Sequence, residues 1–147
     1  MSDTTTHSSS RAPEPVGAYP HAKRAGDLLF LSGVGPRQRG SSEIPGVTLD
    51  ADGQVTDHDI EVQCRACFEN VKAILEDAGA SWNDIVDVLV FLTDMDGDFK
   101  TYNKVYAEYF AGEGNPNPTR TTIEINCLPT PIAVEVKVVA HLAGSSE

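Results

Sequence analysis

The sequence predicts an α+β fold in which two helices cover one face of a mixed β-sheet. Two long segments, residues 57–78 and 96–111, place apolar side chains at helical spacing, and short runs rich in β-branched residues lie around them. The chain has 147 residues, which is enough for one compact domain and too few for two. We therefore expect a single domain over residues 15–143.

Both ends of the chain are polar. Residues 1–14 are mostly Ser, Thr, Pro and charged residues, and residues 144–147 are similar. Such segments bury too little apolar surface to offset the conformational entropy that is lost on ordering. We predict that residues 1–14 form a disordered, mobile tail and that residues 144–147 form a second, shorter one.

The first half of the domain contains a buried strand, a long loop and a helix. Residues 28–32 are an apolar run between glycines, which fits a buried strand. Residues 33–56 are rich in Gly and predict a long loop, with a short strand near residues 47–49 and a turn at residues 52–53. Asp57 is the predicted N-cap of the first helix, which Gly79 ends.

The second half contains a strand, a helix and two further strands. Residues 85–93 are apolar and β-branched, which is typical of a central strand. The second helix is expected to begin near Asp96 and to end at Gly112. Residues 119–126 and 132–142 are the last two predicted strands.

The last strand indicates that the sheet has an uncovered face. Along residues 132–142, neither of the two alternating sets of side chains is uniformly polar. Two helices cover only one face, so the other face needs a partner. A symmetric homo-oligomer is the economical explanation.

Charge and composition exclude several classes of function. The chain has 22 acidic and 11 basic residues and a net charge of -11, which disfavours nucleic-acid binding and adhesion to anionic membranes. No apolar run approaches the ~20 residues that span a bilayer, and the N-terminus lacks the features of a secretory signal. We expect a soluble, cytoplasmic protein.

The spacing of Cys and His residues argues against a metal or redox site. Cys64 and Cys67 lie inside the predicted helix, away from the N-terminal position that activates a thiol pair, so we expect core cysteines. The four histidines show no metal-ligand spacing, and residues 33–37 lack the pattern of a phosphate-binding loop. We predict no metal and no nucleotide cofactor.

Two charged residues are candidates for chemistry. Glu135 lies in an apolar strand, where a carboxylate must be paired, hydrogen-bonded or shifted in pKa; a solvated edge carboxylate is the alternative. Arg120 lies at the start of a strand, where a guanidinium can bind a carboxylate through two hydrogen bonds; a surface ion pair is the alternative. Tyr102, Tyr106 and Tyr109 follow helical spacing, which indicates core packing.

Several segments, in this order and at these spacings, resemble the RidA/YjgF family of enamine and imine deaminases. The resemblance covers residues 15–142 and is carried by five stretches: residues 16–19, 31–33, 70–79, 84–94 and 118–136. It implies a chorismate-mutase-like fold whose subunits form a trimeric barrel. It also implies ligand sites at the subunit interfaces, and it leaves open whether trimers pair into hexamers.

The resemblance assigns roles to individual residues. Arg120 matches the arginine that binds the ligand carboxylate, and Glu135 matches the glutamate that positions or activates water. The family commonly has a cysteine where this chain has Thr122, so a hydroxyl or backbone contact is expected there. The reaction it implies needs no cofactor. The remaining residues expected to bind the substrate are Tyr19, Ser32, Gly33 and Asn103.

Within the family, the sequence is most similar to enzymes that convert 2-aminomuconate to 4-oxalocrotonate and ammonia in aromatic-acid catabolism. Residues 18–27, the arginine-bearing loop after Gly33 and residues 126–131 carry this similarity. A dicarboxylate needs a second cation, and Arg37 and Arg39 are the candidates; solvated loop charges are the alternative.

Other functions remain open at this point. A general deaminase of 2-iminopropanoate and 2-iminobutanoate would use the same Arg120 and Glu135. A ligand-binding regulatory trimer without turnover would need the arginine but has no use for the glutamate. An endoribonuclease is disfavoured by the acidic charge of the chain.

Overall fold

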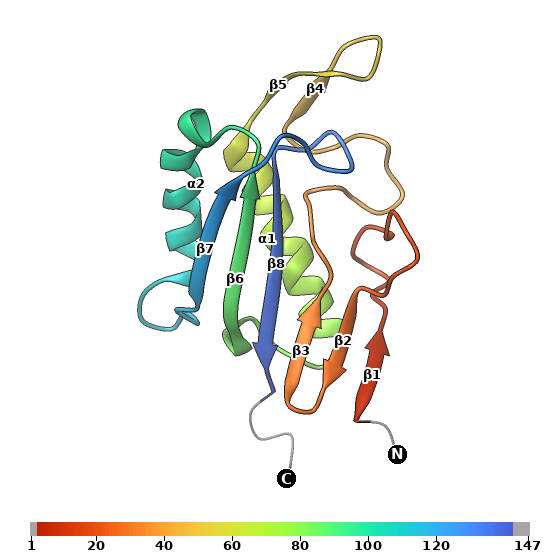
Figure 1. The fold of residues 1–147 in the computed structure, drawn as a ribbon, viewed down its shortest axis with the longest axis vertical. Coiled ribbons are helices and arrows are strands. Elements are labelled where there is room, and N and C mark those ends of the chain that lie inside the picture. Colours follow the sequence, from red (N-terminus) through yellow and green to blue (C-terminus); the bar gives the residue numbers. More distant parts are fainter. Residues whose placement is uncertain (1–2, 143–147) are drawn as a thin grey trace.

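The computed structural model describes residues 3–142, which form a six-stranded mixed sheet with two helices on one face (Figure 1). This is the α+β arrangement that the sequence predicts. The helices are α1 (Ile60–Asp77) and α2 (Met95–Phe110), with a short 3-10 turn at Trp82–Asp84. A separate hairpin consists of β4 (Val47–Leu49) and β5 (Val55–His58). The sheet contains β1 (Thr4–His7), β2 (Ala22–Ala25), β3 (Leu28–Leu31), β6 (Ile85–Leu92), β7 (Thr119–Glu124) and β8 (Val134–His141).

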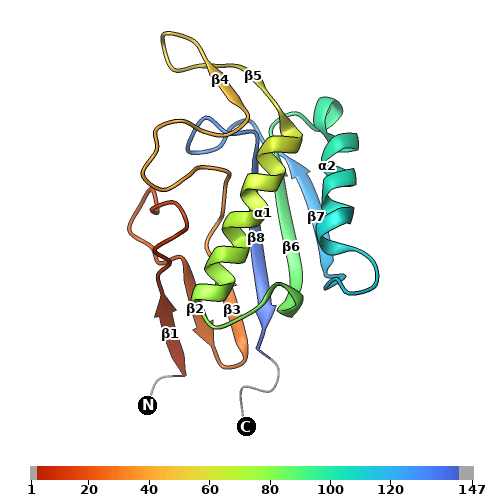
Figure 2. The same cartoon turned by 180° about the vertical axis from the view of Figure 1, so that it is seen from behind.

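The last strand of the chain lies inside the sheet. The strand order is β1-β2-β3-β8-β6-β7, so β8 pairs on both of its edges, antiparallel to β3 and to β6. The strands β6 and β7 are parallel and are joined through α2. Both helices lie on the face of the sheet that is turned toward the viewer in Figure 2, and Figure 1 looks onto the uncovered face.

Alternation along the central strands builds the core on the helix side. On β8, Val134, Val136 and Val138 are fully buried, whereas Glu135 and Lys137 point to the other face. The helices add large buried side chains and two thiols, and burial raises the pKa of Cys64 to about 12. The side chains that the helices bury here include Cys64, Cys67, Phe68, Leu75, Tyr102 and Phe110.

The N-cap of α1 is Asp59, not Asp57 as the sequence predicted. The Asp59 carboxylate accepts a hydrogen bond from the backbone N–H of Val62 at 3.2 Å, while Asp57 is part of β5 and pairs with Thr48. The sequence places an acidic residue at both positions, and strand pairing decided between them. The helix ends before Gly79, whose positive φ of 85° a glycine adopts without strain.

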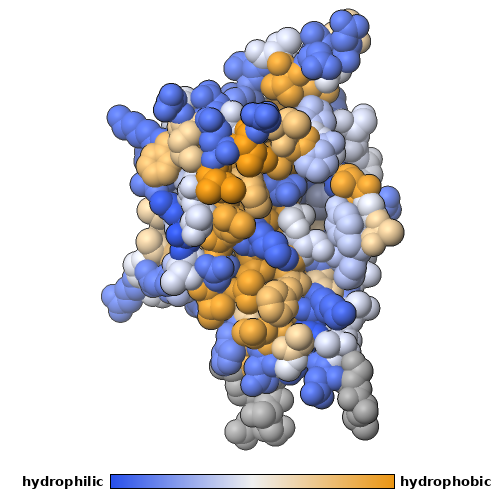
Figure 3. Space-filling model, viewed as in Figure 1, coloured by the Kyte–Doolittle hydropathy of each residue, from blue (hydrophilic) through white to orange (hydrophobic). Residues whose placement is uncertain are grey.

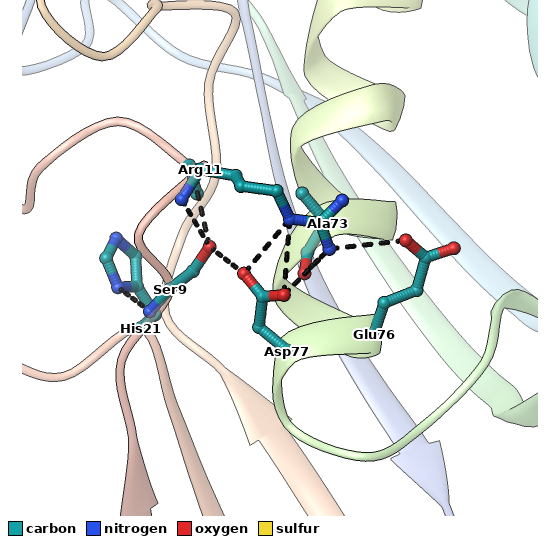
Figure 4. Close-up of polar contacts among 7 residues, drawn as sticks. Ser9, Arg11, His21, Ala73, Glu76 and Asp77 are labelled. Carbon is teal, nitrogen blue, oxygen red and sulfur yellow. Dashed lines mark hydrogen bonds and ion pairs between the residues drawn. The ribbon is translucent and has the colours of Figure 1, made fainter.

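The predicted N-terminal tail is also corrected by the structure. The strand β1 pairs antiparallel with β2, and Ser9 and Arg11 are tied to α1 (Figure 4). The Asp77 carboxylate accepts hydrogen bonds from the Ser9 hydroxyl at 2.6 Å and from the Arg11 guanidinium at 2.8 Å. Backbone pairing and charged hydrogen bonds therefore order a segment that has little apolar surface. The second predicted tail, residues 144–147, lies outside the described residues.

Neither α1 nor α2 is long and apolar enough to cross a membrane, and residues 3–142 contain no other candidate helix.

The two acidic residues before α1 make a test of the cap. We expect Asp59→Ala to lower the free energy of unfolding by about 1 kcal/mol, because an N–H in the first turn of the helix loses its acceptor. The matched change Asp57→Ala, at an exposed strand position, is expected to cost less than about 0.5 kcal/mol. Urea denaturation measures both. A larger loss for Asp57→Ala would assign the cap to Asp57.

Candidate active site

The predicted site residues fall into two groups on opposite faces of the sheet. Glu135 pairs with Phe91 of β6 and lies on the uncovered face. Arg120 pairs with Val88 of β6, whose side chain is buried under the helices. Residues paired across strands share a face, so the sheet separates the carboxylate from the guanidinium within one chain.

Glu135 lies against the backbone of Gly33. A Cβ atom at Gly33 would lie only 2.6 Å from Oε2 of Glu135, so a larger residue would displace the carboxylate. The backbone φ of Gly33 is not in the left-handed region, so a larger residue there would act through the Glu135 side chain, which would have to move. Paired hydrogen bonds between the backbones of Val34 and Val136, at 2.8 and 2.9 Å, fix the two strands at this point.

An open cavity of about 330 Å³ lies beside the Glu135 carboxylate. Burial raises the pKa of Glu135, and the positive charge of Arg37 partly offsets this shift. A carboxyl group with a raised pKa is a stronger base once it is ionised. The other residues that line this cavity are Val16, Tyr19, Ser32, Gly33 and Pro129.

Hydrogen bonds hold two of the predicted wall residues in place. The Ser32 hydroxyl donates to the carbonyl of Pro20 at 2.7 Å, and the Tyr19 hydroxyl accepts from the backbone N–H of Val16 at 3.2 Å. Tyr19 is 41% exposed, so its ring forms an accessible wall. The structure thus gathers Tyr19, Ser32 and Gly33 around Glu135.

The two loop arginines have different surroundings. Arg39 donates to the carbonyls of Ala12 and Ser9 at 2.8 and 2.9 Å and pairs with the Glu14 carboxylate at 3.0 Å. Its guanidinium therefore fastens the N-terminal segment to the loop. Arg37 donates to the Glu14 carbonyl and lines a cavity together with Glu135. Of the two candidates for a second carboxylate, only Arg37 lies beside Glu135.

Arg120 belongs to a cluster between β7 and α2. Its Nη1 donates to Asn103 Oδ1 at 2.8 Å, and its Cζ lies 4.6 Å from the ring centre of Tyr106 and 5.4 Å from that of Tyr102. The Tyr102 hydroxyl bonds to the Thr122 hydroxyl at 2.7 Å. Asn103 and Thr122, two of the residues predicted to bind the substrate, are thus next to Arg120, whereas Tyr19, Ser32 and Gly33 lie around Glu135.

Sequence periodicity does not identify the tyrosines as partners of Arg120. It predicts core packing for Tyr102 and Tyr106, and both are buried in the core. The available signal is the spacing on α2: Tyr106 follows Tyr102 by four residues and Asn103 by three, and residues three to four apart share a helix face.

The uncovered face of the sheet carries exposed apolar side chains. Leu28, Phe30 and Ile123 are each 38–39% exposed and lie on the same face as Glu135. Figure 3, drawn in the view of Figure 1, shows apolar side chains gathered along the middle of this face. Exposed apolar side chains gathered on one face are typical of surfaces that contact a partner. Among residues 3–142, no group of three or more His, Cys, Asp and Glu side chains is placed to hold a metal ion.

Sequence comparisons identify relatives along nearly the whole chain. A family model described as Endoribonuclease L-PSP matches residues 9–142. A RutC family protein of Pyrococcus horikoshii is 40% identical over 131 residues, which are 88% of this chain and 91% of that protein. The TdcF protein of Escherichia coli, whose name describes a reactive intermediate deaminase, is 35% identical over 130 residues, covering 88% of this chain and 91% of TdcF.

Solved structures have the same fold. The crystal structure of Escherichia coli TdcF with bound serine matches with a TM-score of 0.79 and 33% identity, over 93% of this chain and 98% of that chain. The Escherichia coli YjgF gene product matches with a TM-score of 0.79 and 30% identity, over 93% and 98% of the two chains. The chain therefore belongs to the Endoribonuclease L-PSP family, the family of RidA and YjgF.

Proposed function

We propose that this protein is a cofactor-independent hydrolase that deaminates an enamine or imine acid. The observation that carries the proposal is Glu135, a half-buried carboxylate held against the Gly33 backbone at the wall of an open cavity. Its raised pKa suits a group that takes a proton from water. The name of TdcF and the serine in its structure, which carries nitrogen on the carbon next to the carboxylate, support the same substrate class.

The proposed reaction uses Arg120 to bind and Glu135 to move protons. Arg120 binds the carboxylate beside the nitrogen-bearing carbon, and the enamine tautomerises to the imine. Glu135 takes a proton from water while the water oxygen bonds to that carbon, and it then delivers the proton to nitrogen. The second water proton moves from the new hydroxyl to nitrogen as the C–N bond breaks. Ammonia and a 2-oxo acid leave, and Glu135 is ionised again.

The proposed site is shared between subunits of a homotrimer. Within one chain the sheet separates Arg120 from Glu135, so one subunit does not present both groups to one small ligand. The apolar side chains on the uncovered face supply a surface for association. In a cyclic trimer, the Glu135 cavity of each subunit faces the Arg120 cluster of its neighbour.

The proposed substrate is 2-aminomuconate, a dicarboxylate. The cation that supports this choice is Arg37, which lines a cavity with Glu135 and whose Nε and Nη1 have no hydrogen-bond partner among residues 3–142. A second carboxylate without a cation would be left unpaired in the site. The net charge of -11 makes such a local cation more necessary for an anionic substrate.

Substrate preference tests this proposal. We expect ammonia release from 2-aminomuconate, generated in the assay, at a higher kcat/KM than from 2-iminopropanoate, and loss of both activities in Arg120→Ala. Arg37→Gln should lower kcat/KM for the dicarboxylate about tenfold or more, because a charged hydrogen bond is lost, and change the other substrate little.

The matched control is Arg24→Gln, which removes the same charge from an arginine on β2 that donates to the Gly26 carbonyl. A higher kcat/KM for 2-iminopropanoate would show that the protein acts on general imine acids and not mainly on the dicarboxylate. Inactivity on both substrates would contradict the deaminase and leave a carboxylate-binding protein.

Mixed subunits test the shared site. Arg120→Ala and Glu135→Gln are each expected to be inactive alone, but a trimer that contains both variants has one intact site. Co-expressed variants carrying two different tags and purified on both should therefore recover about one third of the wild-type activity. Mixed trimers with no activity would place Arg120 and Glu135 of the same subunit in one site.

The pH dependence tests the contact between Arg37 and Glu135. Glu135 must be ionised to accept a proton, so kcat/KM should fall as pH falls through its pKa. The Arg37 charge lowers this pKa, so Arg37→Gln is expected to raise it and to move the acid limb of the profile to higher pH. The profile is measured with 2-iminopropanoate, which has only one carboxylate, so that the loss of Arg37 does not also weaken the binding of a second carboxylate. An unchanged limb, or an equal shift in Arg24→Gln, would contradict the contact.

A further inference from the structure

Two hydroxyl groups form a pair inside the Arg120 cluster. The Tyr102 and Thr122 hydroxyl oxygens lie 2.7 Å apart, and Tyr102 is fully buried between α2 and the sheet. Thr122 follows Arg120 by two residues on β7, so the two side chains share a face of that strand. The family resemblance places a cysteine at this position, and the pair with Tyr102 is therefore a feature of this chain's own residues.

The proton count and the burial of the two hydroxyl groups indicate which of them donates the hydrogen bond. Each hydroxyl has one proton to donate, and one hydrogen bond between the two groups uses only one of the two protons. Tyr102 has no exposed surface through which to reach a ligand, whereas Thr122 is only partly buried. Burial also raises the pKa of Tyr102, which keeps its proton in place as a donor. When Tyr102 donates to Thr122, the Thr122 proton is left for an acceptor beside Arg120.

We propose that Tyr102 is a positioning residue for carboxylate recognition: its ring supports the Arg120 guanidinium, and its hydroxyl directs the Thr122 proton toward the carboxylate that Arg120 binds. This inference rests on the proposed function, because it takes the Arg120 carboxylate site as its starting point. Tyr102 itself does not touch the ligand. The arginine supplies charge and two donors, and the threonine supplies a third donor from the same strand face.

Tyr106 contacts Arg120 through its ring but within residues 3–142 has no hydroxyl hydrogen bond like that of Tyr102, so comparing the two shows what the hydroxyl contributes. Tyr106 lies one helical turn after Tyr102, and its ring centre is 4.6 Å from the Arg120 Cζ. Its hydroxyl is buried and has no hydrogen-bond partner among the described residues. Tyr106 therefore supports Arg120 through its ring alone. Tyr106→Phe removes a hydroxyl from the same cluster without removing a hydrogen bond.

Binding of pyruvate, a stable 2-oxo acid, tests the proposal by calorimetry on the full-length protein. We expect Tyr102→Phe and Thr122→Val each to weaken the Kd about tenfold, since the first leaves the Thr122 hydroxyl without the group that directs its proton and the second removes that hydroxyl. The double variant should be no weaker than Thr122→Val, because the tyrosine acts through the threonine. Thr122→Ser keeps the hydroxyl and is expected to recover most of the affinity that Thr122→Val loses. Tyr106→Phe keeps the ring that contacts Arg120 and is expected to lose less affinity than Tyr102→Phe.

Turnover of 2-iminopropanoate adds a second readout. Loss of carboxylate positioning should appear mainly in KM, whereas a general loss of structure would lower Tm and leave the Kd of the folded protein unchanged. A wild-type Kd in Tyr102→Phe, or losses that multiply in the double variant, would overturn the role of Tyr102. Pyruvate binding needs no turnover, so an inactive protein that still shows the predicted Kd pattern would disprove the deaminase and keep the inference. Wild-type protein that does not bind pyruvate would overturn both.

Discussion

The alternation of side chains along β8 is the constraint on which the rest of the structure depends. Because β8 pairs with β3 on one edge and β6 on the other, its side chains can point only to the two faces of the sheet. One set forms the centre of the core under the helices, and the other set carries Glu135 onto the uncovered face. A register shift of one residue would bury the carboxylate in the core and expose the valines.

The same alternation determines which charged groups lie together within one chain. β7 runs beside β6 in a register that places Arg120 under α2, while β8 places Glu135 on the opposite face. The two groups therefore do not form an ion pair with each other within one chain. The Arg120 cluster is held by ring contacts and one amide hydrogen bond, whereas Glu135 is held by close packing against Gly33. Association through the apolar face is the step that we propose brings the two halves together.

The N-terminal segment contributes to the site although its composition suggests a tail. Arg39 and the Ser9–Asp77 hydrogen bond fasten residues 9–14 to the body of the domain. Pro13, Glu14 and Tyr19 then line a small cavity with Gly33 and Arg37. Polar contacts at a few positions thus order one wall of the region around Glu135, and they engage Arg39 with the N-terminal segment while Arg37 lines a cavity with Glu135.

The sequence by itself determined the two helices, the apolar central strands, the buried cysteines and the unusual placement of Glu135, because periodicity and local composition record which face of an element is buried. The resemblance to a family added the expectation that Arg120 and Glu135 act on the same ligand. Only the tertiary structure decided that Asp59 caps α1, that β1 joins the sheet, that Arg39 holds the N-terminal segment, and that Tyr102 and Thr122 share a hydrogen bond. These features depend on contacts between residues far apart in the chain, on strand register and on the direction of polar side chains, none of which leaves a periodic signal in the sequence.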